Sequence, residues 1–435
     1  MTESRNPATL ALHAGWRADP ATGAVAVPIY QTTSYQFADS GHARDLFALD
    51  QLGFTYTRTG NPTTDVLEKR VAALEGGVGA LALASGQAAS AFSVLALARA
   101  GDNIVSSTDL YGGTWNLWAN TLARQGISVR FADPADPDSF RRLTDARTRA
   151  YYAETLPNPK LTVFPIAEVA AIGREAGIPL IVDNTAAPLL ARPLQHGAAV
   201  VVYSATKYLG GHGTSLGGVI VDGGNFDWRA HPARQPALNE PDPSYHGAVW
   251  TEVADKHGIG AYAALVRSTV QRDLGAPISP FNAFLILQGI ETLPLRIERH
   301  SSNAAAVAAW LARQPGVVRV IYPSHQTGTA LARADRYLRG GFGGLVGVEL
   351  AGGAAAGAAF IDRLKLFYHV ANIGDARSLA IHPATTTHSQ LSPAEQAASG
   401  VTPGYVRLSI GIEHIDDILA DLALGLAGGT LAAAA

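Results

Sequence analysis

One lysine of this chain lies where a reactive amine would be useful. Lys207 belongs to the segment Ser204-Ala-Thr-Lys207, between an apolar run at residues 198–203 and a glycine-rich turn. The apolar run predicts a buried strand, and poor solvation at its end lowers the pKa of a lysine. A free amine near neutral pH is what a Schiff-base lysine requires. Ser204 and Thr206 add hydroxyls that suit a phosphate, although the segment taken alone would favour a surface loop.

A carboxylate is expected near this amine. Asp183 ends the apolar run 179–183, and 24 residues separate it from Lys207, enough for a short crossover helix and the next strand. Both side chains would then emerge at one edge of a sheet, outside the carboxyl ends of its strands, where ligands bind. A buried carboxylate needs a partner. A protonated pyridine nitrogen is one such partner, and a helix N-terminus is the alternative.

Further motifs lie at predicted strand ends and near the N-terminus. Ser85-Gly86-Gln87 stands between a strand and a helix, where free amides bind phosphate. Tyr111 follows another strand and could stack on an aromatic ring, and Asn158 of Glu154-Thr-Leu-Pro-Asn-Pro159 offers an amide to a ring hydroxyl. Tyr56 and Arg58 offer a phenol and a guanidinium suited to phosphate. In this order along one sheet, the motifs describe a pyridoxal phosphate site.

The combined motifs resemble the pyridoxal-phosphate enzymes of cysteine and methionine metabolism. The likeness runs nearly end to end, from Leu12-His-Ala-Gly15 to Arg407-Leu-Ser-Ile-Gly-Ile-Glu413. It implies the type I aspartate aminotransferase fold, with Lys207 as the Schiff-base residue and Asp183 at the pyridine nitrogen. It also implies that Tyr111 stacks on the ring and that Asn158 contacts the 3-hydroxyl side.

The resemblance implies three groups of site residues. Those expected to bind the cofactor are Tyr56, Arg58, Ser85, Gly86, Gln87, Tyr111, Asn158, Asp183, Ser204, Thr206 and Lys207. Those expected to act in catalysis are Lys207, Tyr111 and Tyr56. Those expected to bind substrate are Asn61, Arg377, Ser378 and Arg407, the last clamping an α-carboxylate. Tyr56 and Arg58 would reach the cofactor of a neighbouring subunit in a homo-oligomer, usually a tetramer. No metal site is expected, and His382 and His388 are interpreted as structural or gating residues.

Within the family, local segments resemble the O-acetylhomoserine sulfhydrylases. They are Leu110-Tyr-Gly-Gly-Thr-Trp-Asn, Glu240-Pro-Asp-Pro-Ser-Tyr-His246, Asn372-Ile-Gly-Asp-Ala-Arg-Ser-Leu379 and His382-Pro-Ala-Thr-Thr-Thr-His388. The implied reaction is γ-replacement, in which O-acetyl-L-homoserine and sulfide or methanethiol give L-homocysteine or methionine and acetate. Several relatives carry a glutamate where Arg377 stands, and that glutamate is thought to help receive amino-bearing substrates. Arg377 therefore argues against cysteine as the donor.

Other activities stay open at this point. Cystathionine γ-synthase, O-succinylhomoserine sulfhydrylase and methionine γ-lyase use the same scaffold. A non-catalytic pyridoxal-binding protein would be expected to have lost Lys207, Asp183 or Arg407, and all three are present. A nicotinamide-dependent dehydrogenase is a further alternative, but Gly210-Gly-His-Gly213 lacks the spacing of a dinucleotide fingerprint.

Three parts of the chain differ in pattern. Residues 1–65 are rich in turns and punctuated by prolines, which predicts an arm that packs on a neighbouring subunit. Residues 66–281 alternate helices with continuously apolar strands, typical of an α/β fold with a mainly parallel sheet between helices. Within them, residues from about 223 to 260 are predicted to form an insertion loop. Residues 282–435 predict a smaller α+β domain, entered through a long helical stretch at 280–313.

Composition restricts the partners and the location. The chain has 435 residues, 47% of them hydrophobic, so it can bury a large core. A formal net charge of -3 offers no basic field to nucleic acid or to anionic lipid. The absence of cysteine excludes disulfides, thiolate metal sites and a cysteine nucleophile. Since no signal peptide and no membrane-length apolar run are recognised, we expect a cytoplasmic protein.

Overall fold

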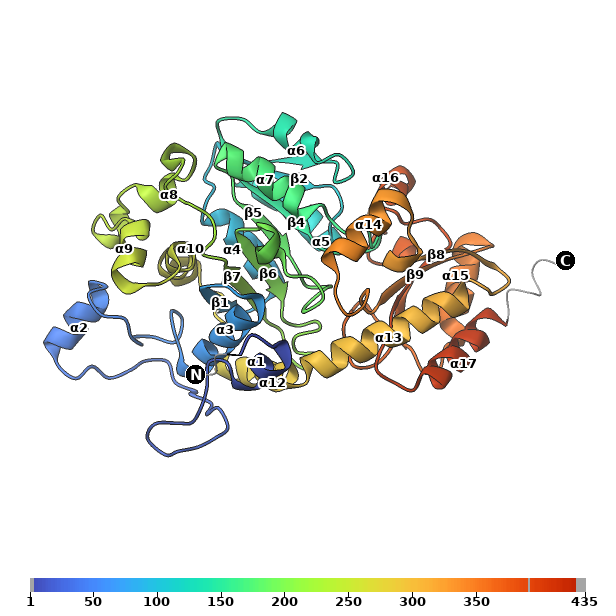
Figure 1. Cartoon of the computed structure of the whole chain (residues 1–435), viewed down its shortest axis with the longest axis horizontal. Coiled ribbons are helices and arrows are strands. Elements are labelled where there is room, and N and C mark those ends of the chain that lie inside the picture. The colour runs from blue at the N-terminus through green and yellow to red at the C-terminus, as the bar shows by residue number, and fades with distance from the viewer. Residues whose placement is uncertain (1–3, 390–391, 428–435) are drawn as a thin grey trace.

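The computed structural model describes residues 4–389 and 392–427 and contains two sheets that lie side by side (Figure 1). The larger sheet has the strand order β1-β7-β6-β5-β4-β2-β3. Its strands are β1 (Gly79–Leu83), β2 (Asn103–Ser107), β3 (Ser128–Ala132), β4 (Thr148–Glu154), β5 (Leu180–Asp183), β6 (Val200–Ser204) and β7 (Gly218–Asp222). β2 to β6 run parallel, whereas β7 is antiparallel to both of its neighbours. The expected α/β fold with a mainly parallel sheet is confirmed.

Helices cover both faces of the larger sheet. The helices of this part are α3 (Pro62–Glu75), α4 (Gly86–Leu95), α5 (Gly112–Asn116), α6 (Asp138–Leu143), α7 (Ile166–Ala176), α10 (Ala261–Val266) and α11 (Arg272–Leu274). In β6, Val201 and Tyr203 belong to the hydrophobic cluster that contains α3 and α7, while Val200 and Val202 belong to the cluster that contains α4 and α10. Burial on both faces explains why these strands are continuously apolar in the sequence.

The direction of β7 follows from its connection to β6. Residues 205–217 contain no helix, so the chain turns back and β7 pairs with β6 in the antiparallel sense. β1 is antiparallel to β7 and therefore runs in the same direction as β6. The segments that follow β1, β2, β4, β5 and β6 consequently start at one edge of the sheet. Ser85, Tyr111, Asn158, Asp183 and Lys207 all lie at or just beyond these strand ends.

The second sheet is built from the C-terminal residues, in the order β10-β11-β12-β9-β8. Its strands are β8 (Val317–Ile321), β9 (Leu345–Leu350), β10 (Tyr368–His369), β11 (Leu379–Ile381) and β12 (Tyr405–Ser409). The helices of this half of the chain are α12 (Pro280–Glu291), α13 (Leu293–Leu311), α14 (Gly328–Tyr337), α15 (Gly353–Arg363), α16 (Pro393–Ala398) and α17 (Ile415–Leu426), of which α12 packs against α3 in the core of the larger sheet. α13, α15 and α17 share a hydrophobic cluster with this sheet. The predicted helical stretch at 280–313 is interrupted at Thr292, because Pro294 cannot continue the hydrogen bonds of a preceding helix.

The region predicted as an insertion loop contains helical structure. It forms α8 (Pro236–Asn239) and α9 (Trp250–His257) together with two short 3-10 turns. Pro236 occupies the first position of α8, where a missing N–H costs nothing. Trp228 and Trp250 are buried against the neighbouring helices. Pro232, Pro236 and Pro243 each begin one of these short helices, whereas the residues between them are turns, so the predicted insertion loop is partly helical.

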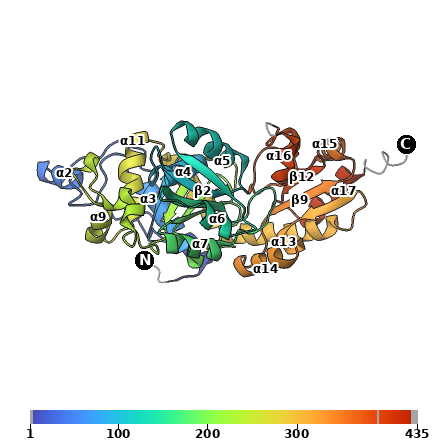
Figure 2. The same cartoon turned by 90° about the horizontal axis from the view of Figure 1, so that it is seen from above.

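The N-terminal segment extends from the body of the protein. Apart from α1 (Pro7–His13) and α2 (Ser40–Phe47), residues 4–61 form no helix or strand, and they loop outward at the blue end of the chain (Figures 1 and 2). Large apolar side chains stay exposed on this segment, among them Val25, Phe47 and Leu52. No helix within the described residues is long and apolar enough to cross a membrane.

A buried polar network joins α3 to β5 and β6. Glu75 accepts hydrogen bonds from the Tyr203 hydroxyl and from the Asn184 amide, and Asn184 also donates to the Tyr203 oxygen at 2.8 Å. Burial raises the pKa of Glu75 to about 7, against a smaller opposing effect of the Tyr203 hydrogen bond. The carboxyl group is therefore protonated in the folded protein at mildly acidic pH, where it would be ionised in the unfolded chain.

We expect the substitution Glu75→Gln to remove a pH-dependent part of the stability. The pKa of Glu75 is about 7 in the folded protein against an ordinary 4.5, so its contribution is complete below the unfolded pKa and is lost as the pH rises through 7. The loss amounts to about 3 kcal/mol at most. Urea unfolding at several pH values measures the free energy of unfolding. This free energy should decline more steeply with rising pH in the wild type than in Glu75→Gln. The exposed control Glu240→Gln should keep the wild-type slope, and equal slopes in all three proteins would contradict the prediction.

Candidate active site

Lys207 lies in the connection between β6 and β7, and its side chain is largely buried. Its Nζ atom donates a hydrogen bond to Oδ1 of Asn372 at 2.5 Å. Burial lowers the pKa of Lys207 to about 8, and repulsion by the Arg407 guanidinium acts in the same direction. The amine is thus easier to deprotonate than an ordinary lysine, as the sequence predicted from its position after a buried strand.

Two carboxyl groups lie next to each other on β4 and β5. Glu154 and Asp183 are paired residues in the register of these parallel strands; Glu154 is buried and Asp183 is partly buried. Burial raises the pKa of Asp183 to about 6, opposed by hydrogen bonds from Thr185. Burial, followed by repulsion from Asp183, raises the pKa of Glu154 well above its usual value. One anion is therefore favoured over two at this edge, and a positively charged ring nitrogen would stabilise Asp183 as that anion.

Glu154 also fixes the loop that carries Tyr111. Its Oε1 atom accepts a hydrogen bond from the main-chain N–H of Tyr111 at 2.6 Å. Tyr111 is 49% exposed, so part of the residue is accessible to a ligand. Asn158 is buried, and its side-chain oxygen has no hydrogen-bond partner among the residues that the structure describes. An unpaired buried acceptor of this kind points to a missing donor.

The start of α4 forms a narrow cradle against the end of β6. The Ser85 hydroxyl accepts from the N–H of Ala88 and caps the helix. A Cβ atom added to Gly86 would lie 2.5 Å from Cβ of Ser204, so only glycine permits this approach. Gln87 lies beside Thr114, 3.5 Å from its hydroxyl. The Thr206 hydroxyl exchanges hydrogen bonds with the main chain of Gly217, which holds the β6–β7 connection together.

These features fit pyridoxal phosphate. The N–H groups at the start of α4, with Ser204 opposite, suit the phosphate. Asp183 suits the ring nitrogen, the unpaired oxygen of Asn158 suits a ring hydroxyl, and the half-exposed Tyr111 suits the ring face. Lys207 supplies an amine with a lowered pKa. Every one of these groups belongs to the same sheet edge, as the motif order predicted.

Arg407 brings a cation to the same edge from the second sheet. It lies on β12, is 5% exposed, and donates from Nη2 to the main-chain oxygen of Asn372 at 3.0 Å. Burial lowers its pKa, partly compensated by Tyr405, Tyr111 and Tyr208. Among the described residues, no carboxylate forms an ion pair with Arg407. A buried guanidinium without a counter-ion is suited to bind the carboxylate of a ligand.

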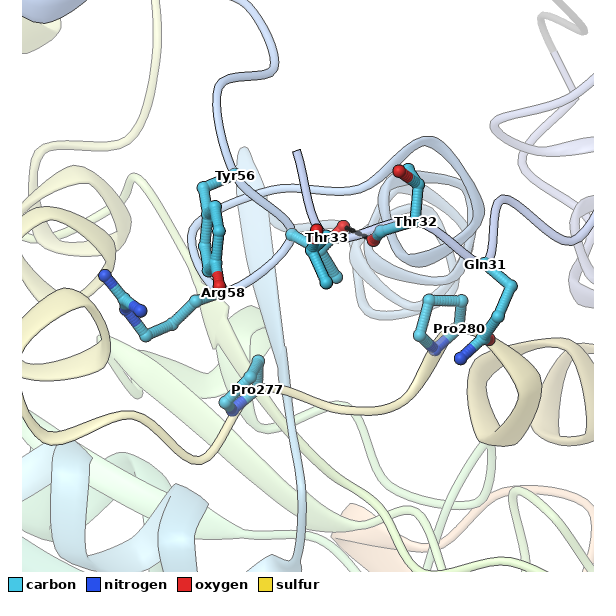
Figure 3. A pocket seen from close by; sticks show the side chains of 8 residues that line it. Gln31, Thr32, Thr33, Tyr56, Arg58, Pro277 and Pro280 are labelled. Carbon is cyan, nitrogen blue, oxygen red and sulfur yellow. Dashed lines mark hydrogen bonds between the residues drawn. The ribbon is translucent and has the colours of Figure 1, made fainter. Parts of the chain in front are cut away.

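Tyr56 and Arg58 lie in a different place from Lys207. They line a cavity of about 410 Å³ together with Gln31, Thr32, Thr33, Thr57, Pro277 and Pro280. Figure 3 shows the Arg58 guanidinium close to the Tyr56 ring; its Cζ atom is 5.0 Å from the ring centroid, and Nε donates to the main-chain oxygen of Arg272. None of the residues at the sheet edge that carries Lys207 lines this cavity.

Two residues expected to bind substrate have other roles within the chain. Asn61 is fully buried; its amide donates to the Tyr30 oxygen at 2.8 Å, and its oxygen caps α3 by accepting from the Thr63 N–H. Ser378 is also fully buried and is bonded through both N–H and hydroxyl to Glu413. Asn61 and Ser378 are therefore engaged within their own chain, and their expected contact with substrate stays a prediction.

The Arg377 guanidinium already has partners within the chain. Its Nε atom lies 2.9 Å from a carboxylate oxygen of Asp375, and Nη2 donates to the main-chain oxygen of His212 in the turn after Lys207. The side chain is nevertheless 53% exposed. Its part in donor selection stays a prediction, but the ion pair with Asp375 already neutralises much of its charge.

Sequence reasoning missed two residues of this site. Glu154 is one residue of the motif at 154–159, and its signal is its position at the end of the strand beside Asp183. Asn372 is one residue of the segment 372–379, for which the sequence indicates no separate role. Nothing in the sequence connects Asn372 to Lys207, because the two residues are 165 positions apart and lie in connections next to strands of different sheets.

Comparisons with known proteins agree with this geometry. Residues 8–427 match the family described as Cys/Met metabolism PLP-dependent enzyme. The chain is 54% identical to the O-acetyl-L-homoserine sulfhydrylase of Leptospira meyeri, with 97% of each chain covered. It is 50% identical to O-acetyl-L-homoserine sulfhydrylase 1 of Thermus thermophilus, with 96% of this chain and 99% of the relative covered.

One solved structure extends the agreement to the fold. It is a crystal structure from Campylobacter jejuni assigned as an O-acetylhomoserine (thiol)-lyase, and it contains N′-pyridoxyl-lysine 5′-monophosphate. The TM-score is 0.93 at 40% sequence identity, with 97% of this chain and 99% of that chain covered.

We predict that Glu154→Ala weakens the binding of pyridoxal phosphate about tenfold, since it leaves the N–H of Tyr111 without its buried acceptor. Titration of the cofactor-free protein, followed by visible absorbance, measures the affinity. Glu252→Ala, on the exposed side of α9, is the matched control and should bind as the wild type does. An unchanged affinity in Glu154→Ala would show that Glu154 does not organise the site.

Proposed function

The chain belongs to the family of pyridoxal-phosphate-dependent enzymes of cysteine and methionine metabolism, and from this premise we propose that it catalyses γ-replacement on O-acetyl-L-homoserine. In this reaction the bond between Cγ and the ester oxygen breaks, acetate leaves, and a C–S bond forms at Cγ. Sulfide gives L-homocysteine and methanethiol gives methionine. The near full-length similarity to proteins named for this substrate is the observation that supports the proposal most strongly.

Each residue of the site has a role in this reaction that follows from the chemistry of its side chain. Pyridoxal phosphate, when bound, withdraws electrons from the amino acid and makes its protons acidic. Lys207 has an amine of lowered pKa, so it can take the proton from Cα and, in turn, one from Cβ. Arg407 would hold the α-carboxylate and so fix which carbon faces Lys207. Tyr111 and Tyr56 are the candidates to assist proton transfer.

We propose that the active site is shared between subunits of a homo-oligomer, a tetramer built from dimers. Tyr56 and Arg58 line a cavity apart from Lys207, and the segment around them exposes apolar side chains. Both facts support an arm, residues 1–65, that completes the site of a neighbouring copy. The other proposed units are the cofactor domain at 66–281 and the C-terminal domain at 282–435. We propose a cytoplasmic location on the sequence features given above.

The proposed reaction predicts a defined pattern of products. Wild-type protein should form L-homocysteine from O-acetyl-L-homoserine and sulfide, and Lys207→Ala should be folded but inactive because it lacks the proton-transferring amine. Steady-state assays that cross sulfide, methanethiol and cysteine with the acetyl and succinyl esters measure the preference. Absence of homocysteine with the acetyl ester and sulfide would overturn the proposal, and a higher rate with cysteine or the succinyl ester would identify one of the related activities instead.

The shared site predicts complementation between two defective variants. Arg58→Ala should bind the cofactor more weakly because a phosphate ligand is lost, and Lys207→Ala should be inactive. When the two are unfolded and refolded together, mixed dimers contain one site with both native residues, so activity should rise well above that of either variant refolded alone. A mixture that is no more active than the two separate samples would place Arg58 and Lys207 in the same site of one chain.

A further inference from the structure

A single residue connects the lysine to the carboxylate-binding arginine. Asn372 accepts a hydrogen bond from Nζ of Lys207 on its side-chain oxygen, at 2.5 Å, and one from Nη2 of Arg407 on its main-chain oxygen, at 3.0 Å. Lys207 follows β6 of the larger sheet, whereas Arg407 lies on β12 of the smaller one. Asn372 thus relates the position of the amine to the position of the guanidinium.

The segment around Asn372 is held firmly on both sides. Its own N–H donates to the oxygen of Val370. The N–H of Gly374 donates to the Ser409 hydroxyl at the end of β12, at 2.9 Å. The N–H of Ala376 donates to the oxygen of Gly211, in the turn after Lys207. Asn372 is therefore carried by a backbone that is fixed both to the strand of Arg407 and to the turn of Lys207.

We propose that Asn372 is a positioning residue that holds the Lys207 amine in front of the α-carbon of a substrate whose carboxylate is bound by Arg407. The proposal rests on the proposed function for the identity of that substrate. A lysine amine released from its cofactor has N–H groups to donate, and the Asn372 oxygen accepts one of them. The side of the nitrogen that is not bonded to Asn372 then points in a fixed direction. Holding a proton acceptor in a fixed orientation accelerates proton transfer.

An amide serves this purpose without changing the charge of the site. A carboxylate at the same distance would favour the ammonium form and raise the pKa of the lysine. Other charged groups on the surrounding elements are Arg407 on β12, Asp183 on β5, and the Asp375–Arg377 pair on the segment of Asn372. Of these, Arg407 acts to lower the pKa of Lys207. Asn372 therefore orients the amine while leaving it able to accept a proton.

The first test uses the nearly isosteric variant Asn372→Asp and needs no substrate. Cofactor-free protein is treated with acetic anhydride over a range of pH, and acetylation of Lys207 is measured by mass spectrometry of its peptide. The wild-type rate should rise with a midpoint near 8. In Asn372→Asp the midpoint should move upward by about one pH unit or more, because the new carboxylate stabilises the ammonium. The exposed control Asn120→Asp should keep the wild-type midpoint.

The second test uses Asn372→Ala in steady-state kinetics. The main-chain oxygen that receives Arg407 is kept, so KM for the amino acid substrate should change little, while kcat should fall roughly tenfold to a hundredfold because the amine loses its orientation. An unshifted acetylation midpoint in folded Asn372→Asp, or a wild-type kcat in Asn372→Ala, would overturn the proposal. If the wild type itself made no homocysteine, the proposed function would fail, whereas the acetylation midpoints would still test the contact between Asn372 and Lys207.

Discussion

Burial of charge at one edge of the larger sheet is the constraint on which the site depends. Lys207, Asp183 and Glu154 are all held where water solvates them poorly, and each has a pKa moved toward its neutral form. Such groups are costly unless they find partners. A cofactor with a cationic ring nitrogen and an aldehyde matches two of these needs, because it offers Asp183 a counter-charge and Lys207 a covalent partner. The folded chain therefore holds Asp183 and Lys207 in a state that favours binding of this cofactor.

The geometry of that edge follows from strand direction. The helix-free connection from β6 to β7 reverses the chain, and β1 is antiparallel to β7, so β1 and β6 run in the same direction and the start of α4 lies at the edge where Lys207 lies. The close approach of Gly86 to Ser204 depends on this arrangement. The phosphate cradle and the lysine are thus neighbours because β1 and β6 run in the same direction.

The smaller sheet contributes the residues that would recognise the amino acid. Arg407 reaches the site from β12, and Arg296 of α13 donates to the main-chain oxygens of Tyr208 and Leu209, directly after the lysine. The turn that carries Lys207 is therefore braced by the C-terminal part of the chain. Asn372 belongs to this C-terminal part, so that its side chain can contact the Lys207 amine while its main-chain oxygen receives the Arg407 guanidinium.

The sequence by itself determined the α/β class and the strand ends, and it placed the residues expected to bind the cofactor after those strands, because buried parallel strands are continuously apolar and the residues that follow them must meet at one edge. It also determined the family, since the motifs around Lys207, Asp183 and Asn158 are local. Only the tertiary structure decided that Asn61 and Ser378 are buried partners of their own chain, that residues 223–260 are partly helical, and that Asn372 contacts Lys207. These depend on contacts between distant segments, and hydrogen-bond partners chosen by packing leave no periodic signal in the chain.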